Sequence, residues 1–276
     1  MPSLNVLIVA AHDAEGLPWV EAAFGSAPDL ARLARAFDMA DAERQCSAGC
    51  AIDLVVLVES RPGEFAAREI EQFRRLAPLV RFWRVLGSWS EGEQRSGRPP
   101  AGCTSSYWHA WQARMTRELD RWRDDRCPSW GLPLTATADE RIVELVEQPC
   151  DAGHGLVVVC AARSEHARVL ADGCTRGGYQ TLVVAAGQRF AAKDAVAIVW
   201  DTPIEAACDA DEVSRMQRSA GGAPIFIVAG FPRADQVEAA KLAGVAAVIS
   251  KPYLVRDLWW QLARAAETSR SLTTSG

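Results

Sequence analysis

Two oppositely charged residues stand at the ends of apolar runs in the second half of the chain. Residues 195–200 (AVAIVW) lead into Asp201, and residues 246–249 (AAVI) lead through Ser250 into Lys251. Runs of this kind predict strands that are buried on both faces of a parallel sheet. Asp201 and Lys251 thus each stand at the carboxyl end of a predicted strand. The two residues form either a reactive site or a structural ion pair.

A polar loop over residues 89–103 is a second candidate for chemistry, because it is rich in glycine and proline and long for a connecting segment. Glu91, Glu93 and His109 are candidate metal ligands, although their spacing matches no familiar carboxylate–histidine site. The loop could also cradle a phosphate, but it lacks a GKS/T ending and the GxGxxG pattern. The residues for that cradle are Gly92, Arg95, Gly97 and Arg98. A solvated loop is therefore the expectation. The remaining histidines stand singly and predict structural or surface roles: His12, His154 and His166.

The elements that must position Asp201 and Lys251 alternate regularly between strand and helix. Short apolar runs predict five strands, at residues 155–161, 181–186, 195–200, 224–230 and 246–250. Helical spacing of apolar residues predicts helices at residues 164–174, 204–219, 232–242 and 253–267. Strands that alternate with helices of this length predict right-handed crossovers and a parallel sheet covered on both faces. The fold class is therefore α/β, with a doubly wound, flavodoxin-like sheet.

With Asp201 and Lys251-Pro252 in these places, residues 155–267 resemble the receiver domain of bacterial response regulators. The most specific stretch is AGVAAVISKPYLVRDLWWQL, which follows the family's order of Gly-Ala, strand, Lys-Pro and helix. The resemblance implies that Asp201 stands at the phosphoacceptor position. It also implies that Lys251 neutralises the phosphoryl group as a point charge, and that the peptide bond before Pro252 is cis.

Two departures from the family pattern predict a degenerate pseudo-receiver. Receivers hold Mg²⁺ with an acidic pair after the first strand, but this chain has Cys160-Ala161-Ala162-Arg163 there. Receivers also end the fourth strand in a Thr or Ser, whereas this chain has Ala229. Phosphoryl transfer depends on positioning and on neutralisation of charge by metal, so Asp201 is expected to be a poor acceptor. No cofactor is predicted, and Mg²⁺ is expected only if Asp201 works with a displaced acid such as Glu165 or Asp172.

The first half predicts a second, more divergent receiver-like unit. Apolar runs predict strands at residues 5–10, 52–59 and 80–87, and helical spacing predicts helices at residues 19–24 and 64–76. The predicted strand at residues 52–59 stands in the place of a receiver's third strand and ends at Glu59, the equivalent of the phosphoacceptor position, and Ser88 is the candidate for the switch hydroxyl. His12-Asp13 offers one carboxylate after the first strand, and no Lys-Pro pair follows.

The end of the first half departs from the strand–helix alternation. Residues 104–125 predict a long helix, in which Trp108, Trp111, Met115 and Trp122 share one face that is expected to lie in the core. The only candidate for a fifth strand is residues 132–137.

The chain has 276 residues and a formal net charge of −5, so it has no basic field that would favour nucleic acid or an anionic membrane. A Pro- and Gly-containing segment near residue 150 predicts two domains, residues 1–146 and 155–268, joined by a linker at 147–154 and followed by a flexible tail at 269–276. Eight scattered cysteines without a CxxC pair, no secretion signal and no membrane span predict a cytoplasmic protein with reduced thiols.

These observations favour a non-enzymatic signalling protein that acts through a protein partner or as a homodimer. By the resemblance, the docking face comprises the fourth helix, the last strand and the last helix of the second domain, with Trp259, Trp260 and Arg256 as candidate surface residues. Two alternatives remain open. In the first, Asp201 is a working phosphoacceptor in a two-component phosphorelay; in the second, the 89–103 loop serves a small-molecule-binding protein or an enzyme.

Overall fold

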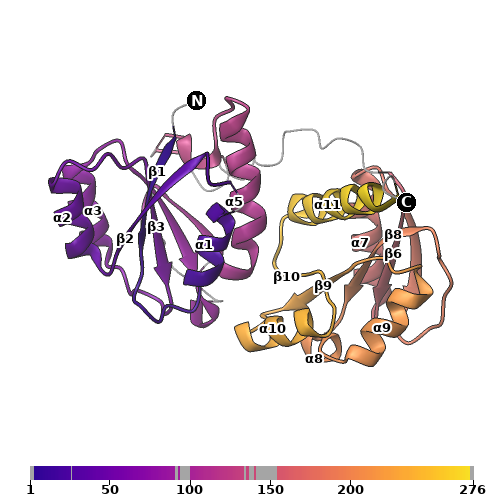
Figure 1. Cartoon of the computed structure of the whole chain (residues 1–276). Helices are drawn as coiled ribbons and strands as arrows, with labels where there is room; N and C mark the ends of the chain where they lie inside the picture. The colour runs from indigo at the N-terminus through magenta and orange to yellow at the C-terminus, as the bar shows by residue number, and fades with distance from the viewer. Residues whose placement is uncertain are drawn as a thin grey trace. The chain divides into compact units, whose positions relative to one another are not determined.

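The computed structural model describes residues 3–25, 27–90, 93, 100–133, 135–136, 140 and 154–273 (Figure 1). The chain divides into two compact units, Met1–Glu147 and Gln148–Gly276. The predicted linker, residues 147–154, lies outside the described residues except for His154. Each unit is built around one five-stranded sheet. Within the described residues, no helix has both the length and the apolar character that crossing a bilayer would require.

The sheet of the first unit is parallel throughout, in the order β2-β1-β3-β4-β5. Helices α1 and α5 pack together on one face, and α2 and α3 pack together on the other (Figure 1). The elements are β1 (Leu4–Val9), α1 (Leu17–Gly25), β2 (Ala31–Ala36), α2 (Met39–Ser47), β3 (Leu54–Glu59), α3 (Ala67–Leu76), β4 (Arg81–Leu86), η1 (Ser88–Ser90), β5 (Cys103–Tyr107), α5 (Trp108–Arg123) and η2 (Ser129–Gly131).

The second unit has the equivalent strand order, β7-β6-β8-β9-β10, again with parallel pairing throughout. Its elements are β6 (Leu156–Ala161), α7 (Ser164–Arg176), β7 (Gln180–Ala185), β8 (Ala195–Asp201), α8 (Ile204–Ala207), α9 (Ala210–Ser219), β9 (Ile225–Gly230), α10 (Ala234–Leu242), β10 (Ala247–Lys251) and α11 (Val255–Thr273). The order 2-1-3-4-5 in both sheets confirms the predicted fold class of two doubly wound, flavodoxin-like units.

Apolar, β-branched strands produce the core of each unit. All six residues of β3 are buried, as are four consecutive residues of β8. Such strands lie in the middle of the sheet because both of their faces can be covered by helices. In the first unit the face shared with α5 is rich in tryptophan, and Trp83, Trp108 and Trp111 are among its largest fully buried side chains. The predicted core role of the α5 tryptophans is confirmed for Trp108 and Trp111.

Two strands of the first unit were not predicted. β2 has the sequence ARLARA, whose four central residues are exposed because it is an edge strand. β5 occupies residues predicted as the start of the 104–125 helix, which begins at Trp108 instead. Pairing with β4 fixes β5 as a strand although its sequence, CTSSY, has no apolar run. The predicted strand at residues 132–137 is wrong, because its described residues form turns and irregular backbone.

Two predicted boundaries of the second unit also differ from the structure. The helix predicted at residues 204–219 is divided into α8 and α9, because the Asp209 carboxylate caps α9 by accepting hydrogen bonds from the backbone N–H groups of Asp211 and Glu212. α11 continues to Thr273, through most of the segment predicted as a flexible tail. Residues 274–276 of that segment lie outside the described residues.

We expect Trp111→Ala to lower the free energy of unfolding of the first unit by about 3–5 kcal/mol, because it opens a cavity in a closely packed core. The Trp111 ring is fully buried. Its centroid lies 5.4 Å from the ring centroid of Trp83 and 5.9 Å from that of Phe24. Denaturant titration, with hydrogen exchange as its readout, measures this change in the free energy of unfolding. Trp89→Ala is the matched control, because Trp89 is 78% exposed and its loss should cost less than about 0.5 kcal/mol. Equal costs for both variants would contradict this packing.

Candidate functional site

Asp201 is the last residue of β8, the central strand of the second sheet. It lies opposite Ala161 of β6 and Val228 of β9 in the strand register. The side chain of Asp201 is only 11% exposed. The carboxylate is therefore partly removed from water, and a group so placed requires nearby positive charge or hydrogen-bond donors.

Lys251 supplies that charge from the end of β10. Its Nζ lies 2.6 Å from Oδ1 and 2.7 Å from Oδ2 of Asp201, so it donates to both carboxylate oxygens. β9 lies between the two strands, and the residue opposite Lys251 there is Gly230. The Lys251–Pro252 peptide bond is cis, as the family resemblance implies. The sequence thus placed both members of this pair correctly at the carboxyl ends of strands.

His166 is a third member of this site that the sequence did not indicate. It lies in the first turn of α7, and its Nδ1 is 3.1 Å from Oδ2 of Asp201. The sequence predicted only a structural or surface role, because a single histidine carries no spacing signal. The Asp201 carboxylate is therefore contacted by a lysine and a histidine at the same time.

The side chains around Asp201 do not fit Mg²⁺. The residue opposite Asp201 is the buried Ala161, followed by Ala162 and Arg163, and Ala229 ends the apolar part of β9. Mg²⁺ is held by several oxygen ligands, and the side chains of Ala161, Ala162, Arg163 and Ala229 supply none. Among the described residues, no cluster of three or more His, Cys, Asp or Glu side chains could hold a metal ion.

Neither predicted displaced acid contacts this carboxylate. Glu165 and Asp172 are both exposed on α7, and the structure shows no contact from either of them to Asp201. Tyr253, two residues beyond Lys251, is a further titratable group that interacts electrostatically with Asp201. Burial, together with the negative charge of Asp201, raises the pKa of Tyr253 to about 12. The phenol therefore stays protonated at neutral pH.

Glu59 occupies the equivalent position in the first unit, at the end of β3, and it is fully buried. Arg84 of β4 donates to its Oε2 from Nε at 2.9 Å and from a terminal nitrogen at 2.5 Å. The backbone N–H of Gly63 donates to Oε1 at 3.0 Å. Arg84 also lies 3.6 Å from Oε2 of Glu93. Here an arginine from the neighbouring strand, rather than a lysine from two strands away, neutralises the carboxylate.

Ser88 follows the end of β4, and its hydroxyl is engaged by another residue that the sequence did not indicate. Its Oγ donates to Oε2 of Glu15 at 2.9 Å, and its backbone N–H donates to the same oxygen at 3.1 Å. Glu15 lies between β1 and α1. The sequence offered Asp13 as the carboxylate after the first strand, whereas the carboxylate that contacts Ser88 is that of Glu15. The centroid of the His12 ring lies 4.3 Å from that of Phe37.

The predicted docking residues of α11 need one correction. Arg256 is only 7% exposed, so its side chain is not available to a partner. Trp259 is partly exposed, and its indole N–H donates to the carbonyl oxygen of Gly173 at 2.8 Å, which ties α11 to α7. Trp260 is also partly exposed and lies under the guanidinium group of Arg264, 4.8 Å from the ring centroid.

Most of the candidate site residues of the 89–103 loop lie in the part of the chain that the structure does not describe. These are Glu91, Gly92, Arg95, Gly97 and Arg98. Of the remaining candidates, Glu93 lies beside Arg84, and the His109 ring stacks on that of Tyr107 at 5.5 Å. The proposed use of this loop by a small-molecule-binding protein or an enzyme stays a prediction.

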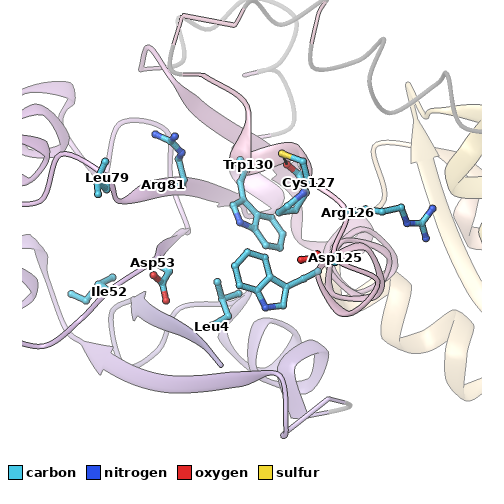
Figure 2. A pocket seen from close by; sticks show the side chains of 12 residues that line it. Leu4, Ile52, Asp53, Leu79, Arg81, Asp125, Arg126, Cys127 and Trp130 are labelled. Carbon is cyan, nitrogen blue, oxygen red and sulfur yellow. Dashed lines mark hydrogen bonds between the residues drawn. The ribbon is translucent and has the colours of Figure 1, made fainter. Parts of the chain in front are cut away.

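A hollow of about 500 Å³ lies at the opposite, amino end of the first sheet (Figure 2). Trp130 and Leu4 contribute to its apolar lining, while the Arg126 side chain extends away from the Trp130 ring (Figure 2). Asp53 is also in the lining, but its carboxylate accepts from the backbone and side-chain N–H groups of Asn5 at 2.8 and 2.9 Å. The hollow is separate from the carboxyl end that carries Glu59 and Ser88.

No protein-family model and no curated protein matches the chain. Its fold is similar to that of a C-terminal part of Escherichia coli RcsC that contains a linker region and a phosphoreceiver domain, with 13% identity, a TM-score of 0.34 and coverage of 98% of this chain and 96% of that one. It is also similar to full-length ShkA in complex with AMPPNP, with 16% identity, a TM-score of 0.32 and coverage of 95% of this chain but only 50% of ShkA. A putative D-3-phosphoglycerate dehydrogenase from Ralstonia solanacearum has 10% identity and a TM-score of 0.26, with coverage of 99% and 95%. These similarities concern the fold.

We expect Lys251→Met to lower the free energy of unfolding of the second unit by about 1–2 kcal/mol, because the poorly exposed Asp201 carboxylate loses its ammonium partner. The figure is discounted for screening, since the Lys251 side chain is 34% exposed. Urea denaturation measures the change. Asp201→Asn should restore part of the loss in the Lys251→Met background, and Lys241→Met, at an exposed lysine, is the matched control. A loss that is the same with or without Asp201 would contradict this pairing.

Glu59 predicts a pH dependence of stability in the first unit. Burial outweighs the attraction of Arg84 and raises the pKa of Glu59 above its ordinary value of 4.5. The folded state therefore holds this proton more tightly than the unfolded state. The resulting stabilisation is complete below the unfolded pKa and is lost as pH rises through the folded one. The difference in unfolding free energy between the wild-type protein and Glu59→Gln should fall as pH rises from 4.5, as urea titrations across pH would measure. An unchanged or rising difference would contradict a raised pKa.

Proposed function

We propose that the protein is a receiver-like signalling protein that works through protein–protein contacts without accepting a phosphoryl group. The observation that carries the proposal is the state of Asp201, both of whose carboxylate oxygens accept from Lys251 while His166 lies against Oδ2. The side chains of Lys251 and His166 thus take the place that a metal ion and an incoming phosphoryl group would share.

The chemistry of phosphoryl transfer explains why this arrangement favours an inactive acceptor. The transferred group is highly charged, and its transfer depends on cations that neutralise it and on groups that position it. Ala161, opposite Asp201, has no oxygen for Mg²⁺ in its side chain, and Ala229 has no hydroxyl to contact a phosphoryl oxygen. Lys251 alone could neutralise only part of that charge.

The first unit supports the same proposal independently. A phosphoacceptor changes state when a phosphoryl group arrives, but Glu59 is fully buried against Arg84 and offers no exposed oxygen. The Ser88 hydroxyl is likewise engaged by the Glu15 carboxylate. Both units would therefore present one constant surface to a partner. The partner proposed is a protein, and the proposal involves no enzyme activity, no cofactor, no nucleic acid and no membrane; a cytoplasmic location stays a prediction.

The second candidate function is a working phosphoacceptor in a phosphorelay. The retained contact between Lys251 and Asp201 favours it, because a lysine at this place could hold a phosphoryl oxygen after transfer. The two candidates differ in one measurable outcome, the covalent modification of Asp201.

We expect no phosphoryl adduct on Asp201 when the full-length protein is incubated with acetyl phosphate and Mg²⁺ and analysed by intact mass. The matched variant Ala161→Asp/Ala162→Asp/His166→Ala supplies carboxylates beside Asp201 and removes the imidazole, so it should gain a mass of about 80 Da, the phosphoryl group. Adding Asp201→Asn should abolish that gain. An adduct of about 80 Da on the wild-type protein that is lost in Asp201→Asn would reject the proposal in favour of the phosphorelay.

A further inference from the structure

β7 is an edge strand of the second sheet, and within the described residues of this unit no helix follows it before β8. Residues 186–194, all within the described part of the chain, connect β7 to β8 through turns and irregular backbone. In the first unit, by contrast, α2 follows the equivalent edge strand, β2, and packs beside α3. Among the described residues of the second unit, no equivalent of α2 covers β7.

The sequence of β7 lacks the features that normally prevent an edge strand from pairing. The strand, QTLVVA, has no charged residue, and Leu182 and Val183 are 36% and 51% exposed. These two side chains lie on opposite faces of the sheet, so both faces at this edge are apolar. β2, the equivalent edge, carries the exposed charges of Arg32 and Arg35, which discourage pairing with another chain.

Of the four edge strands in the two sheets, β7 is the most open within the described residues. β10 has three buried residues in succession, and β5 is partly or fully buried along its whole length and contacts η2. β2 is exposed but charged. An open, uncharged edge presents free backbone N–H and C=O groups to any strand that can lie alongside it.

Charged residues on the exposed side of α7 indicate which molecule would supply the strand that pairs with β7. Arg168 and Asp172 are four residues apart, so they share one side of the helix, and both are exposed. Gly173, whose carbonyl accepts from Trp259, marks the side of α7 that faces α11, and a helical period of about 3.6 residues places Arg168 well away from it. The structure gives neither charge an ion-pair partner among the described residues.

The arrangement of Arg168 and Asp172 along α7 is complementary to that of a second, antiparallel copy of the helix. If a second copy of the chain approaches so that the two β7 strands run antiparallel, the two α7 helices also run antiparallel on the same face. Arg168 then lies opposite Asp172 of the second copy, and Asp172 lies opposite that copy's Arg168. An isologous contact needs such reciprocal pairing. Val183 lies on the α7 face of the sheet, because its register partner Val159 belongs to the core beneath α7.

We propose that two copies of the chain associate through antiparallel pairing of β7 with β7, with Arg168 and Asp172 of each α7 paired across the two-fold axis. The five-stranded sheet of the second unit in one copy then continues into the same sheet of the other copy. This contact lies on a different part of the unit from the predicted α11 face with Trp259 and Trp260. It goes beyond the proposed function, because it does not depend on whether Asp201 accepts a phosphoryl group.

The test is the oligomeric state of the full-length protein by sedimentation velocity, across a dilution series. The wild-type protein should form a dimer. Arg168→Glu and Asp172→Arg should each weaken it about tenfold or more, because each places like charges opposite one another twice. Mixing the two single variants should restore a dimer, since the introduced glutamate of one chain then meets the introduced arginine of the other, and the double variant should restore it within one chain. Arg32→Glu, on the charged β2 edge, is the matched control and should leave the dimer unchanged.

Hydrogen exchange gives a second measurement that reports on the strand itself. Amides of β7 should become more protected as protein concentration rises, whereas those of β2 should not change. A protein that is monomeric at its highest soluble concentration would overturn the proposal. So would a dimer that Arg168→Glu and Asp172→Arg leave unaffected, since its interface would then lie elsewhere.

Discussion

The contact between Lys251 and Asp201 is the interaction that balances the charge at the carboxyl end of the second sheet. Asp201 must end β8 because the apolar strand before it is buried in the middle of the sheet, and its carboxylate is then only 11% exposed. A carboxylate in that position is costly unless cations or donors satisfy it. Lys251 and His166 contact it from β10 and α7. The alanines beside it fill space without adding a competing charge.

In both units a carboxylate at the end of the central strand is paired with a positively charged side chain, but that side chain comes from a different strand in each unit. In the first unit the cation comes from the strand adjacent to β3, and the planar guanidinium group of Arg84 approaches Oε2 of Glu59 with two nitrogens. In the second unit the cation is a lysine from two strands away, where Gly230 stands opposite it on the intervening strand. A buried arginine pair is costly to break, because loss of one partner leaves the other charge unsatisfied. In each unit a carboxylate at the carboxyl end of the sheet is thus paired with a positively charged side chain of the same unit.

The sequence predicts those parts of the structure that depend on local pattern. Continuous apolar runs identified β3, β8 and β9, and the same kind of run placed Glu59, Asp201 and Lys251 at strand ends. β2 and β5 were missed because an exposed edge strand and a polar strand have no apolar run, and only pairing with neighbours makes them strands. His166 and Glu15 were missed because their contacts join elements that are distant in the chain. Arg84 did carry a signal, since a charged residue inside the apolar sequence RFWRVL requires a buried partner.

The most direct measurement of the central claim is a titration of the full-length protein with Mn²⁺, followed by paramagnetic broadening of its backbone amide resonances. If Lys251 and His166 already satisfy Asp201, the amides of Ala161, Thr202 and Lys251 should broaden no more than those of exposed acidic residues elsewhere. His166→Ala/Lys251→Met provides the comparison in which the carboxylate has lost both partners. Saturable broadening of these three amides in the wild-type protein would show a divalent cation bound beside Asp201 and would contradict the claim.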